Sequence, residues 1–342
     1  MQMPGLFDPW SIGQLELQNR IIVSPMCQYM ALETGETTEW HVVHYGSMAM
    51  GGPSLVMVEA TGVEARGRIS VNDVGLYDDA HMDGLRRIVK FVHQQGVKIG
   101  VQLAHAGRKG DVPTPILAPS AIRFSDHYQT PQEMSREHRE EVLTAFRAAA
   151  QRAVACGFDI IEIHMAHGYL LHQFLSPLSN QREDEFGGSP HNRIRFPLQV
   201  IDAVKEATAD RVPVGIRVSA TDYVAGGYNE EDMAQFCKVF VDHGIDVIDV
   251  SSGGNAPAAP AAYPGYQVPF ASLIKRAVSV PVIAVGMLDD PLLAEHVVRS
   301  GEADAVAIAR GFLRDKHWGH SAARTLRIAP RVPKSYERAY LS

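Results

Sequence analysis

Eight short runs rich in β-branched residues recur along this chain of 342 residues, and stretches with helical spacing separate most of them. Each run ends in polar or small residues. This alternation predicts an α/β fold, a parallel TIM (β/α)8 barrel, in which the strands close on themselves and the helices lie outside. The runs are Ile21–Met26, Ser54–Thr61, Lys98–Leu103, Asp159–Met165, Pro213–Ser219, Val247–Gly253, Pro281–Gly286 and Ala305–Arg310.

The residues that close these runs form the candidate site, because a parallel barrel carries its chemistry at the carboxyl ends of its strands. They combine one thiol, two phenols, two imidazoles, one amide and two guanidinium groups. In chain order they are Cys27 and Tyr29, Ala60, Gln102, His164 with His167 and Tyr169, Arg217, Gly286 and Arg310.

Composition bounds the class of protein. A hydrophobic content of 46% with 21% charged residues is typical of a water-soluble globular protein with a large core, and we expect one domain over residues 1–342. The net charge of −7 comes without a long run of one sign, which argues against nucleic acid and membrane partners. Cys27, Cys156 and Cys237 include no C-x-x-C pair, which argues against a disulfide framework and favours the cytoplasm.

Two segments outside the strands stand out. Ser11–Asn19 alternates apolar and polar residues around Gly13, so we expect a β-hairpin that caps the bottom of the barrel. Ala104–Ser135 is rich in Gly, Pro and Ser and follows the third strand. A loop of this length is more often functional than idle, and we expect it to lie over the barrel mouth and shape a pocket; a mobile insertion without substrate contact is the alternative.

Helical spacing and capping residues mark the outer layer. Asp83–Gln95 and Glu141–Cys156 carry apolar residues at helical spacing, which predicts two outer helices. Asn229 and Asp289 each precede an acidic first turn, which predicts that they cap the helices of the sixth and seventh units.

Three histidines and a tyrosine lie within nine positions after the fourth run. His164 and His167 can donate hydrogen bonds to one oxygen and polarise a carbonyl or nitro group, and Tyr169 can deliver a proton. The alternatives are a metal site that includes His172, or structural residues of a strand-to-helix loop. No Asp, Glu or Cys is well placed beside them, so we expect no metal, and for His172 we favour a packing role.

The motifs that surround these residues give the family. His164–Arg193, Ser24–Tyr29, Gln102–Arg108 and Tyr263–Pro269 together resemble the old yellow enzyme family of flavin-dependent ene reductases. The resemblance is closest to the bacterial branch that carries a cysteine in the first motif, the xenobiotic reductases and NADPH dehydrogenases. It extends from about Leu6 to Tyr340.

The resemblance implies a TIM barrel with bound FMN at its mouth. Arg217 would place a cation beside the flavin pyrimidine edge, Gln102 would hydrogen-bond that edge, and Gly286 with Ala309 and Arg310 would form the phosphate site, although many members have glycine at the position of Ala309. The positions that match the family's FMN residues are Ser24, Pro25, Met26, Cys27, Ala60, Gln102, Arg217, Gly286, Ala309 and Arg310.

The resemblance also implies the reaction. NADPH or NADH reduces FMN, and the reduced flavin passes hydride to the β-carbon of an α,β-unsaturated carbonyl or nitro compound. His164 and His167 hold the substrate oxygen and Tyr169 protonates the α-carbon. Cys27 tunes the flavin without acting as a nucleophile, and Tyr29 hydrogen-bonds the substrate.

The tail Tyr336–Tyr340 resembles the segment that, in this branch, carries an arginine into a neighbouring subunit. We therefore expect a homodimer in which Arg338 reaches the partner's site; a frayed terminus is the alternative. Other function classes stay open at this stage, namely another FMN-barrel dehydrogenase and a non-catalytic flavin-binding protein. The histidine pair and Tyr169 argue against the second class, since holding FMN requires none of them.

Overall fold

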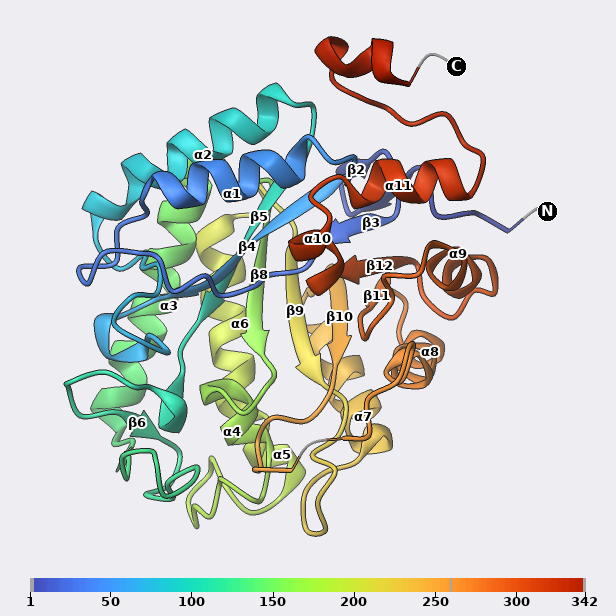
Figure 1. Ribbon diagram of the computed structural model, residues 1–342. Coiled ribbons are helices and arrows are strands. Elements are labelled where there is room, and N and C mark those ends of the chain that lie inside the picture. Colours follow the sequence, from blue (N-terminus) through green and yellow to red (C-terminus); the bar gives the residue numbers. More distant parts are fainter. Residues whose placement is uncertain (1–2, 259, 341–342) are drawn as a thin grey trace.

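The computed structural model describes residues 3–258 and 260–340 and shows a closed barrel of parallel strands inside a ring of helices (Figure 1). Every predicted run contains one strand, so the predicted TIM barrel is confirmed. Around the barrel the strands are β3 (Ile21–Val23), β4 (Leu55–Gly62), β5 (Lys98–Ala104), β8 (Ile160–Met165), β9 (Val214–Ser219), β10 (Val247–Ser251), β11 (Val282–Ala284) and β12 (Ala305–Ile308), which pairs with β3.

The predicted hairpin is present and closes one end of the barrel. β1 (Trp10–Ile12) and β2 (Leu15–Leu17) pair antiparallel around Gly13. Ile12, Leu15 and Leu17 are buried against inward residues of the barrel strands, Ile22 and Leu55 among them. We call this group of apolar side chains the bottom cluster; its burial stabilises the fold.

Helices cover the outer face of the barrel (Figure 1). The predicted outer helices are confirmed as α2 and α3, and α3 begins five residues earlier than expected, at Arg136, because the Ser135 hydroxyl caps it by accepting the His138 amide at 3.2 Å. The helices are α1 (Glu39–Ala49), α2 (Met82–Gln94), α3 (Arg136–Cys156), α4 (Leu170–Leu175), α5 (Pro190–Arg193), α6 (Arg195–Thr208), α7 (Glu230–Asp242), α8 (Val268–Ala277), α9 (Pro291–Arg299), α10 (Arg310–Arg314) and α11 (Trp318–Thr325).

One of the two predicted caps is correct and one is wrong. The Asn229 side chain accepts the Asp232 amide at 2.9 Å and caps α7 as expected. At α9 the cap is Asp290, whose carboxylate accepts the Leu293 amide at 2.9 Å, and not Asp289. Pro291 occupies the first helical position and so fixes the cap one residue before it, while the Asp289 carboxylate pairs with Arg314.

The long segment after β5 lies at the barrel mouth, as expected. It contains a 3-10 turn, Gly107–Lys109, and two short paired strands, β6 (Leu117–Ala118) and β7 (Gln132–Glu133). Lys109 Nζ donates to the His167 carbonyl at 2.9 Å and to the Gly254 carbonyl at 3.1 Å, so this segment is joined to the loops that follow β8 and β10.

None of the helices in residues 3–258 and 260–340 combines the length and the apolar character that a membrane crossing would need.

Candidate active site

Polar side chains gather at the carboxyl ends of neighbouring strands, which is where the sequence places the site. Gln102 on β5, His164 on β8 and Arg217 on β9 are all buried. His164 and Arg217 are paired residues of adjacent strands, so their side chains leave the sheet side by side. The fold therefore brings together residues that are more than 100 positions apart in the chain.

His164, His167 and Tyr169 form one cluster. The His164 ring lies 5.1 Å from the His167 ring and 5.0 Å from the Tyr169 ring, measured between centroids, and both pairs meet edge to face. His167 adopts a left-handed backbone conformation with φ 59°, which only a supported turn sustains in a residue other than glycine. The Ser219 hydroxyl supports it by accepting the His167 amide at 3.0 Å. The predicted cluster is thus assembled at the mouth.

Burial fixes the charge of this cluster. It lowers the pKa of His164 and of His167 well below the usual value, and the nearby Arg217 guanidinium lowers both further. Since His164 Nδ1 accepts the Ala166 amide at 3.3 Å, the hydrogen-bond network assigns the proton of the neutral ring to Nε2. Burial also raises the pKa of Tyr169 well above the usual value, so its phenol keeps its proton. The cluster offers neutral hydrogen-bond donors.

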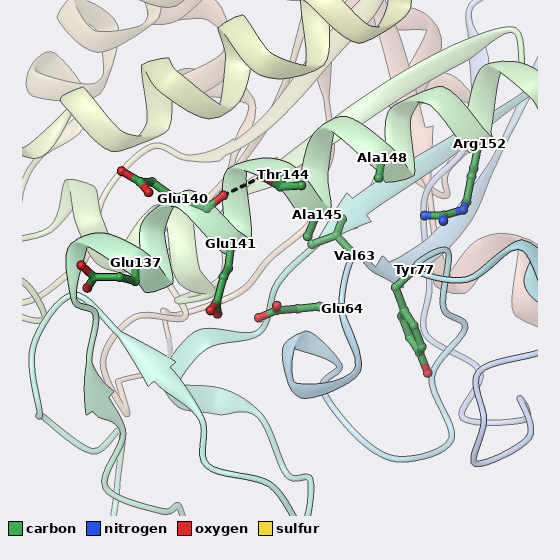
Figure 2. A pocket seen from close by; sticks show the side chains of 10 residues that line it. All are labelled: Val63, Glu64, Tyr77, Glu137, Glu140, Glu141, Thr144, Ala145, Ala148 and Arg152. Atoms are coloured by element: carbon green, nitrogen blue, oxygen red, sulfur yellow. Dashed lines mark hydrogen bonds between the residues drawn. The ribbon is translucent and has the colours of Figure 1, made fainter.

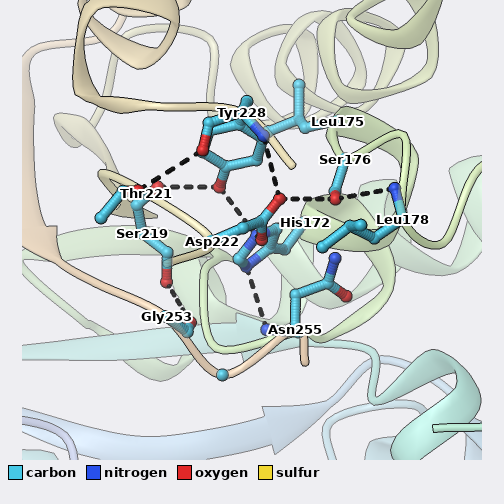
Figure 3. A network of polar contacts seen from close by, with 12 residues as sticks. His172, Leu175, Ser176, Leu178, Ser219, Thr221, Asp222, Tyr228, Gly253 and Asn255 are labelled. Carbon is cyan, nitrogen blue, oxygen red and sulfur yellow. Dashed lines mark hydrogen bonds and ion pairs between the residues drawn. The ribbon is translucent and has the colours of Figure 1, made fainter. Parts of the chain in front are cut away.

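His172 belongs to a separate buried network (Figure 3). Its Nε2 lies 2.9 Å from the Asp222 carboxylate and 2.8 Å from the Tyr228 hydroxyl, and its Nδ1 accepts the Gly168 amide at 3.0 Å. Both nitrogens are therefore engaged in support of the turn that carries His167, which confirms the packing role. Across the described ranges, no three His, Cys, Asp or Glu side chains are grouped so as to hold a metal ion.

Arg217 is available to a bound anion or carbonyl. Its Nη1 donates to Ser24 Oγ at 3.1 Å, and its buried Nε lies 3.3 Å from Asp249 Oδ2 without a well-directed hydrogen bond among the described residues. A buried guanidinium with unused donors is costly unless a ligand accepts them. This observation fits a cofactor such as FMN, whose pyrimidine edge carries carbonyl oxygens.

A cleft beside Arg217 fits the phosphate end of such a cofactor. It has a volume of about 170 Å³ and runs between the ends of β11 and β12. Gly286 has φ 124°, and a Cβ there would lie 2.9 Å from the Gln267 amide nitrogen, so only glycine leaves the cleft open. Four of its lining residues are among the predicted cofactor residues, namely Arg217, Gly286, Ala309 and Arg310. The cleft is present although Ala309 stands where many family members have glycine.

The first motif forms the rim. Burial raises the pKa of the Cys27 thiol far above its usual value, which disfavours the thiolate form. Tyr29 is 52% exposed, and its left-handed backbone conformation, with φ 55°, makes the chain turn at the rim. Between them, the Gln28 amide donates to Glu59 Oε2 at 2.7 Å and ties the rim to β4, next to the buried Ala60.

Sequence reasoning missed Lys109. Its ammonium group lies 5.1 Å from the centre of the Tyr169 ring and 4.6 Å from that of Phe124, and burial lowers its pKa to about 8. A signal was present, because Lys109 directly follows the motif Gln102–Arg108. We therefore add it to the residues at the site.

A larger cavity, about 600 Å³, lies elsewhere, on the outer face of α3 (Figure 2). Two of its carboxylates share one cation, since Arg66 pairs with Glu64 at 2.7 Å and with Glu141 at 2.6 Å. None of the predicted site residues lines this groove. Size alone thus does not locate the chemistry.

Arg338 is not brought to the mouth of its own chain. It lies in the exposed turn Lys334–Ala339, at the end of a tail that projects beyond α11 and away from α4 and β6 (Figure 1).

Comparisons with known proteins agree with this site. Residues 5–328 match the model of the NADH:flavin oxidoreductase / NADH oxidase family. The chain is 48% identical over 336 residues to an NADPH dehydrogenase of Geobacillus sp. (strain WCH70), with 98% of each chain covered. It is 45% identical to an NADPH dehydrogenase of Bacillus subtilis (strain 168), with 98% of this chain and 99% of that one covered.

Solved structures give the same result. Morphinone reductase superposes with a TM-score of 0.82 at 28% identity, over 97% of this chain and 92% of that one. The resemblance of the motifs is therefore confirmed over almost the whole length. The chain belongs to the NADH:flavin oxidoreductase / NADH oxidase family, the old yellow enzyme family, and is an NAD(P)H-dependent flavin oxidoreductase with FMN as its cofactor.

Proposed function

We propose that this enzyme reduces the C=C bond of α,β-unsaturated carbonyl or nitro compounds. The observation that carries the proposal is the neutral cluster of His164, His167 and Tyr169. The His164 ring centroid lies 5.1 Å from that of His167 and 5.0 Å from that of the protonated Tyr169 phenol. Holding a flavin requires none of them. These donors suit a substrate that has both an oxygen to accept hydrogen bonds from the imidazoles and a carbon to accept the proton of the phenol.

The geometry of the mouth supports the proposed set of cofactor residues. FMN, when bound, supplies the hydride that the nicotinamide has delivered to it. Arg217, Gln102 and Ser24 would hold its pyrimidine edge, and Gly286, Ala309 and Arg310 its phosphate. Pro25, Met26, Cys27 and Ala60 would line the ring system. The name of the relatives favours NADPH over NADH as the reductant.

His164 and His167 would hold the substrate oxygen. Because both rings are neutral, they stabilise negative charge on that oxygen by donating hydrogen bonds and do not protonate it outright. Tyr29 at the rim would add a further hydrogen bond. Polarising the oxygen draws electron density from the alkene and prepares its β-carbon for hydride.

Tyr169 would protonate the α-carbon. Its raised pKa keeps the phenol in the acid form, and the Lys109 ammonium over the ring stabilises the charge that develops on the phenolic oxygen as the proton leaves. This pairing gives Lys109 a place in the same step.

Tyr169→Phe tests the proposal by separating the two half-reactions. We expect alkene reduction to fall by about 10²- to 10⁴-fold, the range for loss of a general acid, while flavin reduction by NADPH is unchanged. Stopped-flow absorbance of the flavin measures both with a cyclic enone as acceptor. Tyr77→Phe, at the outer groove, is the matched control. Equal losses in both half-reactions would remove Tyr169 from the proton step.

We also propose a homodimer in which the tail of one subunit places Arg338 in the site of the other. Large apolar side chains are exposed beside the mouth and on α1: Tyr29, Met30, Leu32, Trp40 and Val43. Such a patch is typical of an interface. Light scattering and the turnover of Arg338→Ala test this, since a monomer with unchanged turnover would contradict it. The three free thiols, Cys27, Cys156 and Cys237, suit the cytoplasm.

A further inference from the structure

Two carboxyl side chains lie inside the barrel, where this fold normally packs apolar layers. Glu162 on β8 is 5% exposed and Asp249 on β10 is 2% exposed. Both line an enclosed cavity of about 10 Å³ whose other walls are mainly apolar side chains, including Ile160 and Ile283. That volume is about the minimum that admits one water molecule. Two acids in such a place need a physical reason.

Each carboxyl contacts one of the polar side chains that would hold the flavin. Gln102 Nε2 donates to Glu162 Oε1 at 2.7 Å, and Arg217 Nε lies 3.3 Å from Asp249 Oδ2. Asp249 Oδ1 is buried and has no hydrogen-bond partner among residues 3–258 and 260–340. The two acids thus lie directly behind the proposed cofactor residues, and Asp249 Oδ1 can still accept a hydrogen bond.

The charges do not allow both acids to ionise. One guanidinium, Arg217, faces two carboxyls across a cavity without bulk water, and two negative charges there repel strongly. Burial and, next to it, the charge of Asp249 together raise the pKa of Glu162 to about 8. Arg217 is the cation whose charge acts on both carboxyls, and His164 and His167 are neutral rings. At neutral pH the charge of Arg217 is therefore balanced when one of the two carboxyls is ionised and the other is protonated.

We propose that Glu162 and Asp249 form a carboxyl pair that holds one proton, orients Gln102 and Arg217 toward the flavin, and makes the reduction potential of the flavin depend on pH. The protonated acid donates to the open Asp249 Oδ1, directly or through one water in the cavity. Glu162 in turn accepts from the Gln102 amide nitrogen, which leaves the Gln102 oxygen to accept from the flavin. The inference rests on the proposed placement of FMN.

The direction of the pH effect follows from linkage. Reduction by hydride adds negative charge to the cofactor, which raises the pKa of the pair, so the reduced enzyme holds the shared proton more tightly. As pH rises and the pair loses that proton, a second negative charge appears behind the flavin and reduction becomes less favourable. The potential therefore falls with pH more steeply in this window than the flavin's own protonation requires.

Glu162→Gln tests this, because glutamine mimics the protonated acid and can still accept from Gln102. Between about pH 6.5 and about pH 9.5 we expect the reduced-to-oxidised ratio at fixed potential to fall about tenfold more in the wild type, for a coupling of about one pKa unit. Lys109 also titrates near pH 8 but does so in both proteins. Glu206→Gln, an exposed carboxyl on α6, should match the wild type. Parallel curves for wild type and Glu162→Gln would overturn the proposal.

A second measurement uses the unaltered protein and so does not depend on how the variant folds. The reduced-minus-oxidised infrared spectrum of the wild type should contain a carboxylic acid carbonyl band that shifts when glutamate is labelled with carbon-13. Absence of that band would also overturn the proposal. Arg217→Met separates this failure from a misplaced cofactor: wild-type affinity for FMN in that variant would contradict the placement, whereas weakened affinity with no labelled band would contradict the pair alone.

Discussion

The two ends of the barrel are built from the same eight strands but from opposite chemistry. The bottom cluster consists of apolar side chains sealed by the hairpin of β1 and β2, and Glu162 and Asp249 border it at one small cavity. The mouth buries histidines, a guanidinium and an amide, several of which depend on each other or on a ligand for their hydrogen bonds. Burial of apolar area stabilises the bottom, whereas each buried polar group at the mouth costs stability unless it is paired.

The difference teaches that the mouth is maintained at the expense of stability. Residues such as His167, in a left-handed conformation, persist because surrounding hydrogen bonds support them. We therefore expect substitutions at the mouth to change chemistry, and substitutions at the bottom to change the free energy of unfolding.

His164→Ala, at the mouth, should act on the chemical step rather than on stability. Loss of one donor to the substrate oxygen is expected to reduce kcat/KM for an enone by about 10²- to 10³-fold, the range for removal of an oxyanion donor. Affinity for phenolic ligands, which the flavin absorbance reports, should fall too. FMN should stay bound, because Arg217 and the cleft are untouched. Unchanged kinetics would remove His164 from the oxygen site.

Leu17→Ala should instead act on stability. Leu17 is 1% exposed in the bottom cluster, and truncation of a buried leucine lowers the free energy of unfolding by about 2 to 5 kcal/mol. Urea unfolding measures it, with the exposed Leu292→Ala as control. Flavin affinity and kcat/KM below the transition should match the wild type. A loss of turnover in the folded variant would show that the two ends are not independent.

The sequence predicted the barrel well because its strands are buried on both faces. Such strands read as continuous apolar, β-branched runs, and all eight were located within a few residues. The mouth residues were predicted because strand ends and long motifs coincide there. The histidine cluster needed no knowledge of distant contacts, since His164, His167 and Tyr169 are neighbours in the chain.

What the sequence could not give were features that depend on closure of the barrel. Glu162 and Asp249 look like ordinary strand residues until β8 and β10 face each other across the interior. Lys109 gains its role when the long loop folds back onto the His167 carbonyl. The wrong cap of α9 is a different case, because Pro291 at the first helical position already marks Asp290 as the cap in the sequence.

The mouth should also make stability depend on pH. A histidine whose folded pKa lies below its unfolded value of about 6.5 takes up a proton on unfolding, so the free energy of unfolding falls as pH drops below about 6.5. Burial lowers the pKa of both His164 and His167 in this way. His164→Asn should reduce the slope by about 1.4 kcal/mol per pH unit. Urea unfolding from about pH 5 to about pH 7.5 measures it, and an unchanged slope would contradict the assigned neutral ring.

The smallest expected effect concerns the two aspartates at the mouth side of α9. Asp290→Ala removes the side chain that accepts the Leu293 amide, so it should lower the free energy of unfolding by about 1 kcal/mol. Asp289→Ala removes only a surface ion pair with Arg314 and should cost less than about 0.5 kcal/mol. Comparable losses in both variants would show that the two residues share the cap. Since Asp290 serves the helix rather than the cleft, FMN affinity should survive its loss, which separates structural acids at the mouth from those behind the flavin.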